Sequence, residues 1–113
     1  MLGEVAAARA EYEREPSSLF RLTGLAIVDR KLARVADSDK SFAALVAEHG
    51  DNGLYQQAQV LAQWNRPEDA VGALLKAYDK GDAGLIQSNG DPLIDPLRRD
   101  ARVIRLLRQL GFG

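Results

Sequence analysis

The chain has 113 residues, of which 46% are hydrophobic and 27% are charged, a composition typical of a single folded globular domain with a modest core. Its 15 basic and 16 acidic residues leave a net charge of −1, which argues against wholesale binding to nucleic acid or to a membrane surface. The absence of cysteine excludes disulfides and thiolate chemistry, and no apolar run approaches the roughly 18 residues that a membrane span needs.

Three helices are predicted in the first half of the chain, and each has a local signal at its start or end. Their approximate ranges are 3–14, 19–34 and 38–49. Pro16 ends the first helix, because proline disfavours helical geometry in the residue before it. Ser17 or Ser18 can cap the second helix, and Asp37 or Ser38 can cap the third.

Three further helices are predicted in the second half, at approximately 54–64, 67–80 and 100–110. Pro67 suits the first turn of the middle helix, and Gly81 closes it. A loop at residues 88–92 and a turn at residues 95–96 precede the last helix. No stretch alternates with period two, so an all-α fold is expected.

An internal repeat with a spacing of 32 residues relates the two halves. The first copy contributes Leu22, Leu25, Ala26, Leu32, Ala33, Arg34, Asp37, Ser38, Phe42 and Leu45. Their counterparts, in the same order, are Leu54, Gln57, Ala58, Trp64, Asn65, Arg66, Asp69, Ala70, Leu74 and Ala77. Repetition at this period is typical of stacked helical hairpins, and such a stack exposes a groove that usually serves binding.

The second copy, residues 51–84, has the length of the 34-residue tetratricopeptide unit and resembles that family. The family's small positions hold Ala58, Ala70 and Ala77, and its turn position holds Asn65. The large positions hold Leu54, Leu61 and Leu74. The chain departs from the family pattern at Asp29, Leu45 and Gln57.

The two ends of the chain also resemble parts of this architecture. Residues 91–103 are similar to a D-P-x-x-D-x-L-R-x-D-P-R-F pattern in bacterial proteins with C-terminal tetratricopeptide segments, where it precedes a helix that covers the last repeat. Ala101 and Val103 replace its last proline and its phenylalanine. One domain spanning 1–113 is therefore expected, with a half-repeat helix at 3–16, repeats at 19–50 and 51–84, and a C-terminal cap at 91–113.

The resemblance implies a right-handed superhelical stack in which the first helix of each repeat lines a concave groove. We expect this groove to bind a peptide or protein segment, because it mixes aromatic, amide and basic side chains. The expected contacts are Phe20, Thr23, Ile27, Arg30, Lys31, Tyr55, Gln59 and Gln63. The carboxylate clamp of the family's chaperone-tail binders is not expected, because Thr23 and Ile27 replace its lysine and asparagine.

Two other roles stay open. Residues 3–14 offer an edge for a homodimer, or the chain is a self-associating or regulatory segment of a larger polypeptide. The last helix presents a row of basic residues, Arg98, Arg99, Arg102, Arg105 and Arg108. A solvated face paired with Asp95 and Asp100 is the favoured interpretation. Contact of Arg98, Arg102 and Arg105 with an acidic partner or nucleic acid is the alternative.

The sequence shows no constellation of catalytic or ligand-binding residues, so we expect neither enzymatic activity nor a cofactor or metal. His49 is the only histidine, and a solvated position at a helix C-terminus suits it. The aspartates of residues 91–100 lack the EF-hand spacing and suit turns and caps. The N-terminus lacks the basic-then-apolar order of a signal peptide, so a cytoplasmic location is expected.

Overall fold

The computed structural model describes residues 2–112, and every regular element in that range is helical, which confirms the all-α prediction. The chain divides into two compact units, with the boundary between Gly50 and Asp51. Within the described residues, no helix is long and apolar enough to cross a membrane.

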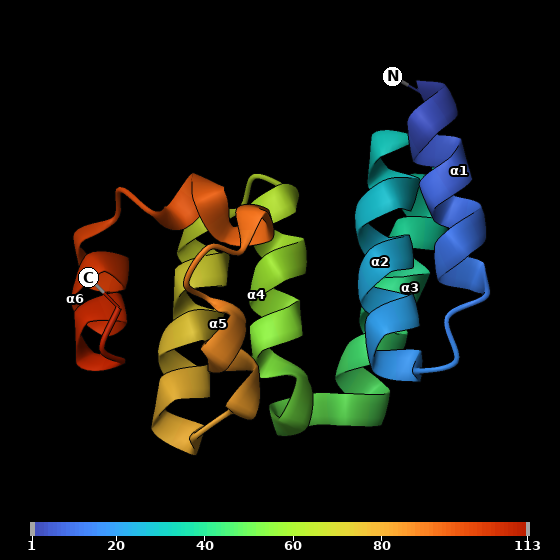
Figure 1. Ribbon diagram of the computed structural model, residues 1–113. Helices are drawn as coiled ribbons and strands as arrows, with labels where there is room; N and C mark the ends of the chain where they lie inside the picture. Colours follow the sequence, from blue (N-terminus) through green and yellow to red (C-terminus); the bar gives the residue numbers. More distant parts are fainter. Residues whose placement is uncertain (1, 113) are drawn as a thin grey trace. The chain divides into compact units, whose positions relative to one another are not determined.

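The first unit contains α1 (Leu2–Glu13), α2 (Ser18–Lys31) and α3 (Val35–His49), as Figure 1 shows. A 3₁₀ helix, η1 (Gly50–Gly53), crosses the boundary between the units. The second unit contains α4 (Leu54–Gln63), α5 (Pro67–Lys80), the 3₁₀ helices η2 (Ala83–Gln87) and η3 (Pro92–Leu97), and α6 (Ala101–Gln109).

The two helix pairs, α2–α3 and α4–α5, turn in the same way. Ala33 and Asn65 stand 32 residues apart, and both have a positive φ, of 62° and 60° respectively. In each turn the next amide donates to the carbonyl five residues back, at 2.7 Å from Arg34 and 2.9 Å from Arg66. The repeat seen in the sequence is therefore also a repeat of backbone structure.

The boundaries of α1 and α2 differ from the predicted ones. α1 ends at Glu13, one residue before the predicted end of the helix and three before that of the 3–16 segment, and α2 ends at Lys31 rather than at residue 34. The left-handed conformation of Ala33 stops α2 early, because it takes the backbone out of the helical region. The prediction of Ser17 as the cap of α2 is confirmed, since its side chain accepts from the amide of Phe20 at 3.4 Å.

The start of α3 was misplaced in the prediction, and neither Asp37 nor Ser38 caps it. The helix begins at Val35, three residues earlier than expected, and its N-cap residue Arg34 makes no side-chain cap hydrogen bond. Ser38 lies inside the helix, where it is fully buried. Its hydroxyl donates to the carbonyl of Ala26 on α2, which satisfies a polar group between the two helices.

Two contacts hold α1 on α2. The ring of Tyr12 lies against Gly24, where an added Cβ would stand only 2.1 Å from a ring carbon. Arg9 Nε donates to Asp29 Oδ1 at 2.6 Å, and the Asp29 side chain is only 2% exposed. This hydrogen bond raises the pKa of Arg9 above its ordinary value. The ion pair explains why an aspartate can replace the large residue of the repeat pattern at this position.

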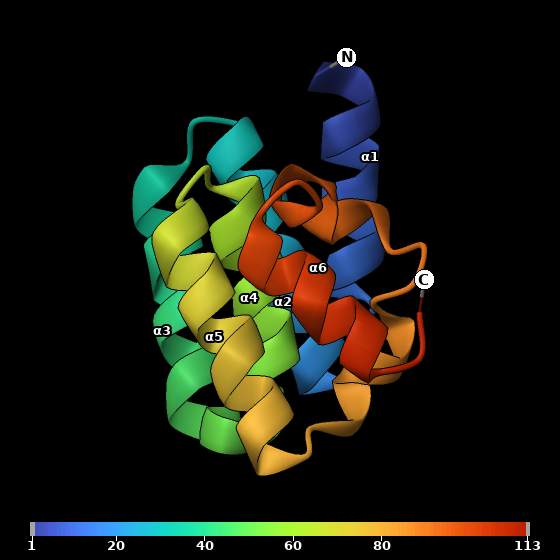
Figure 2. The ribbon, with the colours of Figure 1, turned by 90° about the vertical axis from the view of Figure 1, so that its left-hand side faces the viewer.

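In the second unit, α4 and α5 lie side by side, and α6 packs on α5 (Figures 1 and 2). Ala58, Ala70 and Ala77, which occupy the predicted small positions, are each fully buried, so the helix backbones can approach closely. Val103 and Leu106 bury the apolar side of α6. The predicted bounds of α5 are confirmed, with its first residue a proline and its C-cap Gly81 in the left-handed conformation.

Candidate functional site

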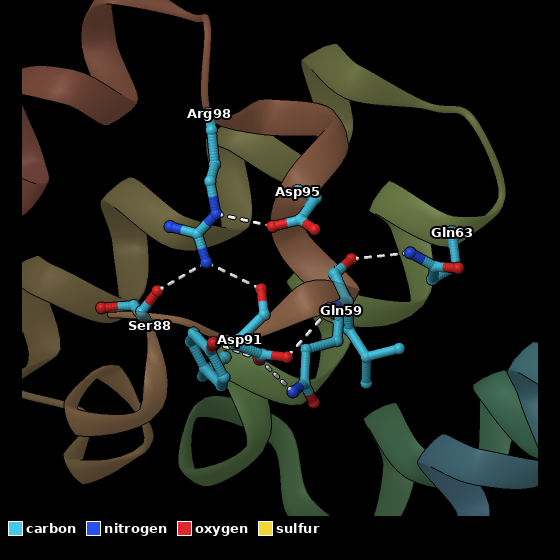
Figure 3. A network of polar contacts seen from close by, with 8 residues as sticks. Gln59, Gln63, Ser88, Asp91, Asp95 and Arg98 are labelled. Carbon is cyan, nitrogen blue, oxygen red and sulfur yellow. Dashed lines mark hydrogen bonds and ion pairs between the residues drawn. The ribbon is translucent and has the colours of Figure 1, made fainter.

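A row of polar side chains on α4 forms the centre of the candidate site. Tyr55, Gln59 and Gln63 are spaced four residues apart, so they follow one line along the helix at a rise of about 6 Å per step. All three are predicted groove contacts. In the structure they point toward a segment of the chain itself, residues 88–98, called here the C-terminal segment (Figure 3).

Each side chain of the α4 row donates one hydrogen bond to the C-terminal segment. The Tyr55 hydroxyl and the Gln59 amide both donate to Oδ2 of Asp91, the amide at 2.7 Å. Gln63 Nε2 donates to the backbone carbonyl of Leu93 at 2.9 Å. Three donors on one helix therefore recognise one carboxylate and one main-chain carbonyl.

The C-terminal segment is shaped by its own polar contacts. Asp91 Oδ1 accepts from the amide of Leu93 at 2.9 Å, which caps η3. Arg98 Nη2 donates to the carbonyls of Ser88 at 2.9 Å and Asp91 at 2.7 Å. Its Nε donates to Asp95 Oδ1 at 2.7 Å, and Figure 3 shows this arginine bridging both ends of the segment. These contacts within the segment hold it as a turn that faces α4.

Apolar burial accompanies these hydrogen bonds. Ile94 and Leu97 of η3 are 0% and 1% exposed, and Tyr55 is itself fully buried. Burial raises the pKa of the Tyr55 hydroxyl above its ordinary value, and the hydrogen bond to Asp91 acts in the same direction. The hydroxyl therefore stays protonated at neutral pH and can donate to the carboxylate.

The expectation that Tyr55 and Gln59 line an open groove is not met, because the C-terminal segment covers them. Gln59 is only 6% exposed, and its amide already has a partner. The sequence marks residues 91–96 as cap and turn signals, which are local features. It carries no signal that tells which helix such a turn packs against, so the contact escaped the sequence analysis.

Asp82 positions the start of α4, a role that the sequence analysis missed. α4 has no capping side chain of its own. Asp82 Oδ2 accepts from the amide of Tyr55 at 3.1 Å, and its Oδ1 accepts from the amide of Gly84 at 2.7 Å. An added Cβ at Gly84 would stand 2.8 Å from the Tyr55 Cβ, so only glycine allows this close approach. The C-terminal end of α5 therefore fixes the N-terminal end of the α4 row.

The predicted groove residues of the first unit all belong to α2 but differ in exposure. Phe20 is 48% exposed, and Lys31 is exposed. Thr23 and Ile27 are each 5% exposed, so neither offers a free surface. Arg30 forms an ion pair with a carboxylate of α3 at 2.7 Å. Phe20 and Lys31 are the predicted contacts that α2 leaves accessible.

The edge predicted for self-association belongs to α1, and its outer surface is small and charged. Tyr12 and Arg9 face α2. Between residues 3 and 13 the exposed positions of α1 are Gly3, Glu4, Ala6, Ala7, Ala10, Glu11 and Glu13. None of these is a large apolar residue, so these positions offer little apolar area to a second copy of the chain.

Two of the five arginines near α6 form the pairs with Asp95 and Asp100 that the favoured interpretation predicts. Arg98 pairs with Asp95 at 2.7 Å, and Arg102 pairs with Asp100 at 2.8 Å. Arg102 also reaches a carboxylate of α5 at 2.8 Å. The Arg102 side chain lowers the pKa of Asp100 to about 2. Arg105 is exposed and makes no ion pair with any described residue.

His49 has a partner in the structure rather than a purely solvated position. Its Nε2 lies 2.8 Å from the Ser18 hydroxyl, which joins the end of α3 to the start of α2. The side chain is 25% exposed. Within the described residues, no group of three or more histidine, cysteine, aspartate or glutamate side chains is placed to hold a metal ion.

An apolar cavity of about 280 Å³ opens at the C-terminal end of α5. Its apolar walls come from α5, η2 and the end of the chain, and include Tyr78, Leu85, Ile86, Leu110 and Phe112. Ile86 is 80% exposed, an unusual position for a large aliphatic side chain. Because the walls come from three separate elements, no local pattern in the sequence predicts this cavity.

Neither a scan against protein-family models nor searches of the curated proteins and of the solved structures gave a match. The α4 row holds a carboxylate and a carbonyl of a short turn through hydrogen-bond donors and apolar neighbours.

Proposed function

We propose that the chain is a protein-interaction module of the tetratricopeptide type, which binds a peptide or protein segment along the first helix of a helix pair. The repeated turn geometry at Ala33 and Asn65 supports this proposal. So do the buried small residues at Ala58, Ala70 and Ala77. The right-handed superhelix of that family is part of the proposal.

One observation carries the proposal: α4, the first helix of its pair, already holds a segment of polypeptide. Tyr55, Gln59 and Gln63 donate to a turn that lies at least 30 residues further along the chain. Such a contact resembles an interface with a bound segment, because it joins helix side chains to a carboxylate and a main-chain carbonyl. A helix face with this chemistry is suited to recognising segments.

In the first unit, the corresponding helix α2 has accessible side chains for a partner. Phe20, near the start of α2, is 48% exposed, and Lys31, at the end of the same helix, is exposed, so each offers a partner an accessible side chain. A bait experiment with the source cell's lysate tests this surface. The wild-type chain is compared with Phe20→Ser and with the matched control Val46→Ser, which removes a residue of similar exposure (41%) from α3.

A partner retained by the wild type and by Val46→Ser, but lost with Phe20→Ser, supports binding along α2. Retention by all three chains contradicts the assignment of this surface. Recovery of the chain alone, with a sedimentation coefficient that rises with concentration, supports self-association in place of a separate partner.

A further inference from the structure

The contacts of the α4 row specify the chemistry of the segment that it holds. Asp91 Oδ2 receives both the Tyr55 hydroxyl and the Gln59 amide. If an uncharged aliphatic residue replaced Asp91, these two buried donors would lose their acceptor, which disfavours such a segment. The row therefore selects for a carboxylate at this position.

Apolar anchors and a turn with its own internal contacts accompany these hydrogen bonds. Ile94 and Leu97 follow the aspartate by three and six residues and are 0% and 1% exposed. Pro92 begins η3 directly after the aspartate, and the Asp91 side chain caps the same turn. A proline and a side-chain cap restrict the free segment, so less conformational entropy is lost on docking.

The segment contains a second Asp-Pro pair, but the α4 row forms hydrogen bonds only with the aspartate of the first. Asp95 precedes Pro96, as Asp91 precedes Pro92. The Asp95 side chain is 63% exposed and pairs with Arg98, which belongs to the same segment. Within the described residues, no hydrogen bond or ion pair joins the Asp95 side chain to α4. The structure itself therefore supplies a matched control for the role of Asp91.

We propose that the α4 row is a recognition site for a partner segment in which an aspartate and a proline are followed by aliphatic residues. The chain's own residues 91–97 occupy the site until such a segment replaces them. This inference rests on the proposed function and names the kind of partner that the second unit takes. A tethered segment has an effective concentration on the order of millimolar, so a partner must bind well enough to compete with it.

A labelled synthetic peptide with the sequence of residues 88–99 tests the proposal in fluorescence anisotropy. The receptor is the full-length chain carrying Asp91→Ala, whose own segment no longer satisfies Tyr55 and Gln59. We expect this receptor to bind the peptide at least tenfold more tightly than the wild-type chain does, because the wild-type site is already occupied. The receptor Asp95→Ala is the control: it loses a contact within the segment but keeps the acceptor of Tyr55 and Gln59, so its affinity for the peptide should stay well below that of Asp91→Ala.

Peptide variants test the specificity in the same assay. A peptide with alanine in place of Asp91 should bind the Asp91→Ala receptor about tenfold or more weakly than the parent peptide, whereas one with alanine in place of Asp95 should lose less affinity, because it keeps the acceptor of Tyr55 and Gln59. A folded Asp91→Ala receptor that binds no peptide, or binds all three peptides equally, overturns the proposal.

If circular dichroism shows that Asp91→Ala is unfolded, the wild-type chain is titrated with the peptide at millimolar concentration. Shifts of the Gln59 and Gln63 side-chain amide signals in nuclear magnetic resonance then support the proposal, and unchanged signals overturn it. If the peptide experiment fails but the Phe20-dependent partner is still captured, the proposed function stands. If the peptide does not bind and no Phe20-dependent partner is captured, the assignment as an interaction module is contradicted.

Discussion

The two units contain the same helix pair but cover its first helix on different sides. In the first unit, α1 contacts α2 at Gly24 and Asp29, whose counterparts 32 residues later are Gln56 and Leu61. In the second unit, the C-terminal segment contacts α4 along the row that begins at Tyr55. The counterparts of this row on α2 are Thr23, Ile27 and Lys31.

This difference shows that a helix pair of this kind needs a further element to cover its apolar face. That element can pack on either of two sides of the first helix. A single repeat cannot bury its hydrophobic surface alone. The first unit is closed by a helix that precedes the pair, with a buried ion pair between Arg9 and Asp29. The second is closed by a segment that follows the pair, with Ile94 and Leu97 as its apolar anchors.

Removing an anchor of the C-terminal segment should have the largest effect. Ile94→Ala deletes a fully buried side chain, so we expect a loss of about 2–5 kcal/mol in the free energy of unfolding. Urea denaturation measures the loss, and hydrogen exchange locates it. Amides of α4 should exchange faster, whereas those of α2 should be unchanged.

The control for this anchor is Ile104→Ala, which removes the same side chain from a position that is 37% exposed on α6. We expect a change within about 0.5 kcal/mol at this surface position. Equal effects of the two substitutions would show that the C-terminal segment does not close the second unit.

Breaking the ion pair of the first unit should have the next largest effect, and the two partners should not be equivalent. Arg9→Ala leaves the Asp29 carboxylate buried without its cation, which costs about 3 kcal/mol. Asp29→Asn leaves a guanidinium that is 22% exposed and still near Glu13, so the loss should be smaller. Urea denaturation at neutral pH compares the two variants. A larger loss for Asp29→Asn would contradict this account.

Glycine substitutions in the two equivalent turns should change the free energy of unfolding less, and in the opposite direction. Ala33 adopts a left-handed conformation that disfavours a Cβ by about 1–2 kcal/mol, so Ala33→Gly should stabilise the first unit by about 0.5–1 kcal/mol after the entropy of glycine is subtracted. Asn65→Gly should change stability less, because asparagine tolerates this conformation. Thermal denaturation of both variants measures the difference. Destabilisation by Ala33→Gly would show that the turn is not strained.

The smallest expected effect is a dependence on pH at the start of α6. Arg102 lowers the pKa of Asp100 in the folded chain to about 2, below its ordinary value of 3.8. The carboxylate therefore contributes stability above about pH 4, and this contribution is lost as the pH falls toward 2. Melting temperatures between pH 2 and 6 should show a shallower dependence for Asp100→Asn. The control Asp79→Asn, at an exposed position of α5, should retain the wild-type slope.

Of the candidate site, the sequence analysis singled out the three α4 side chains but neither Asp91 and Leu93, which they contact, nor Asp82. The spacing of Tyr55, Gln59 and Gln63 places them on one side of a helix, and the structure brings all three to one segment. What covers them depends on the path of the chain after Gly81, through η2 and a turn that Arg98 closes. Three local turn signals do not determine that path.

The sequence by itself determined the helices, their repeat at 32 residues and the turn signals of the second pair, although it did not predict the left-handed Ala33 that ends α2. These features depend on the periodicity of apolar residues and on turn chemistry, as at Asn65, Pro67 and Gly81, which act over a few neighbouring residues. Only the tertiary structure decided which side of each pair is covered. Asp91 meets Tyr55 across 36 residues and Arg9 meets Asp29 across 20, because packing brings distant side chains together in ways that spacing along the chain does not encode.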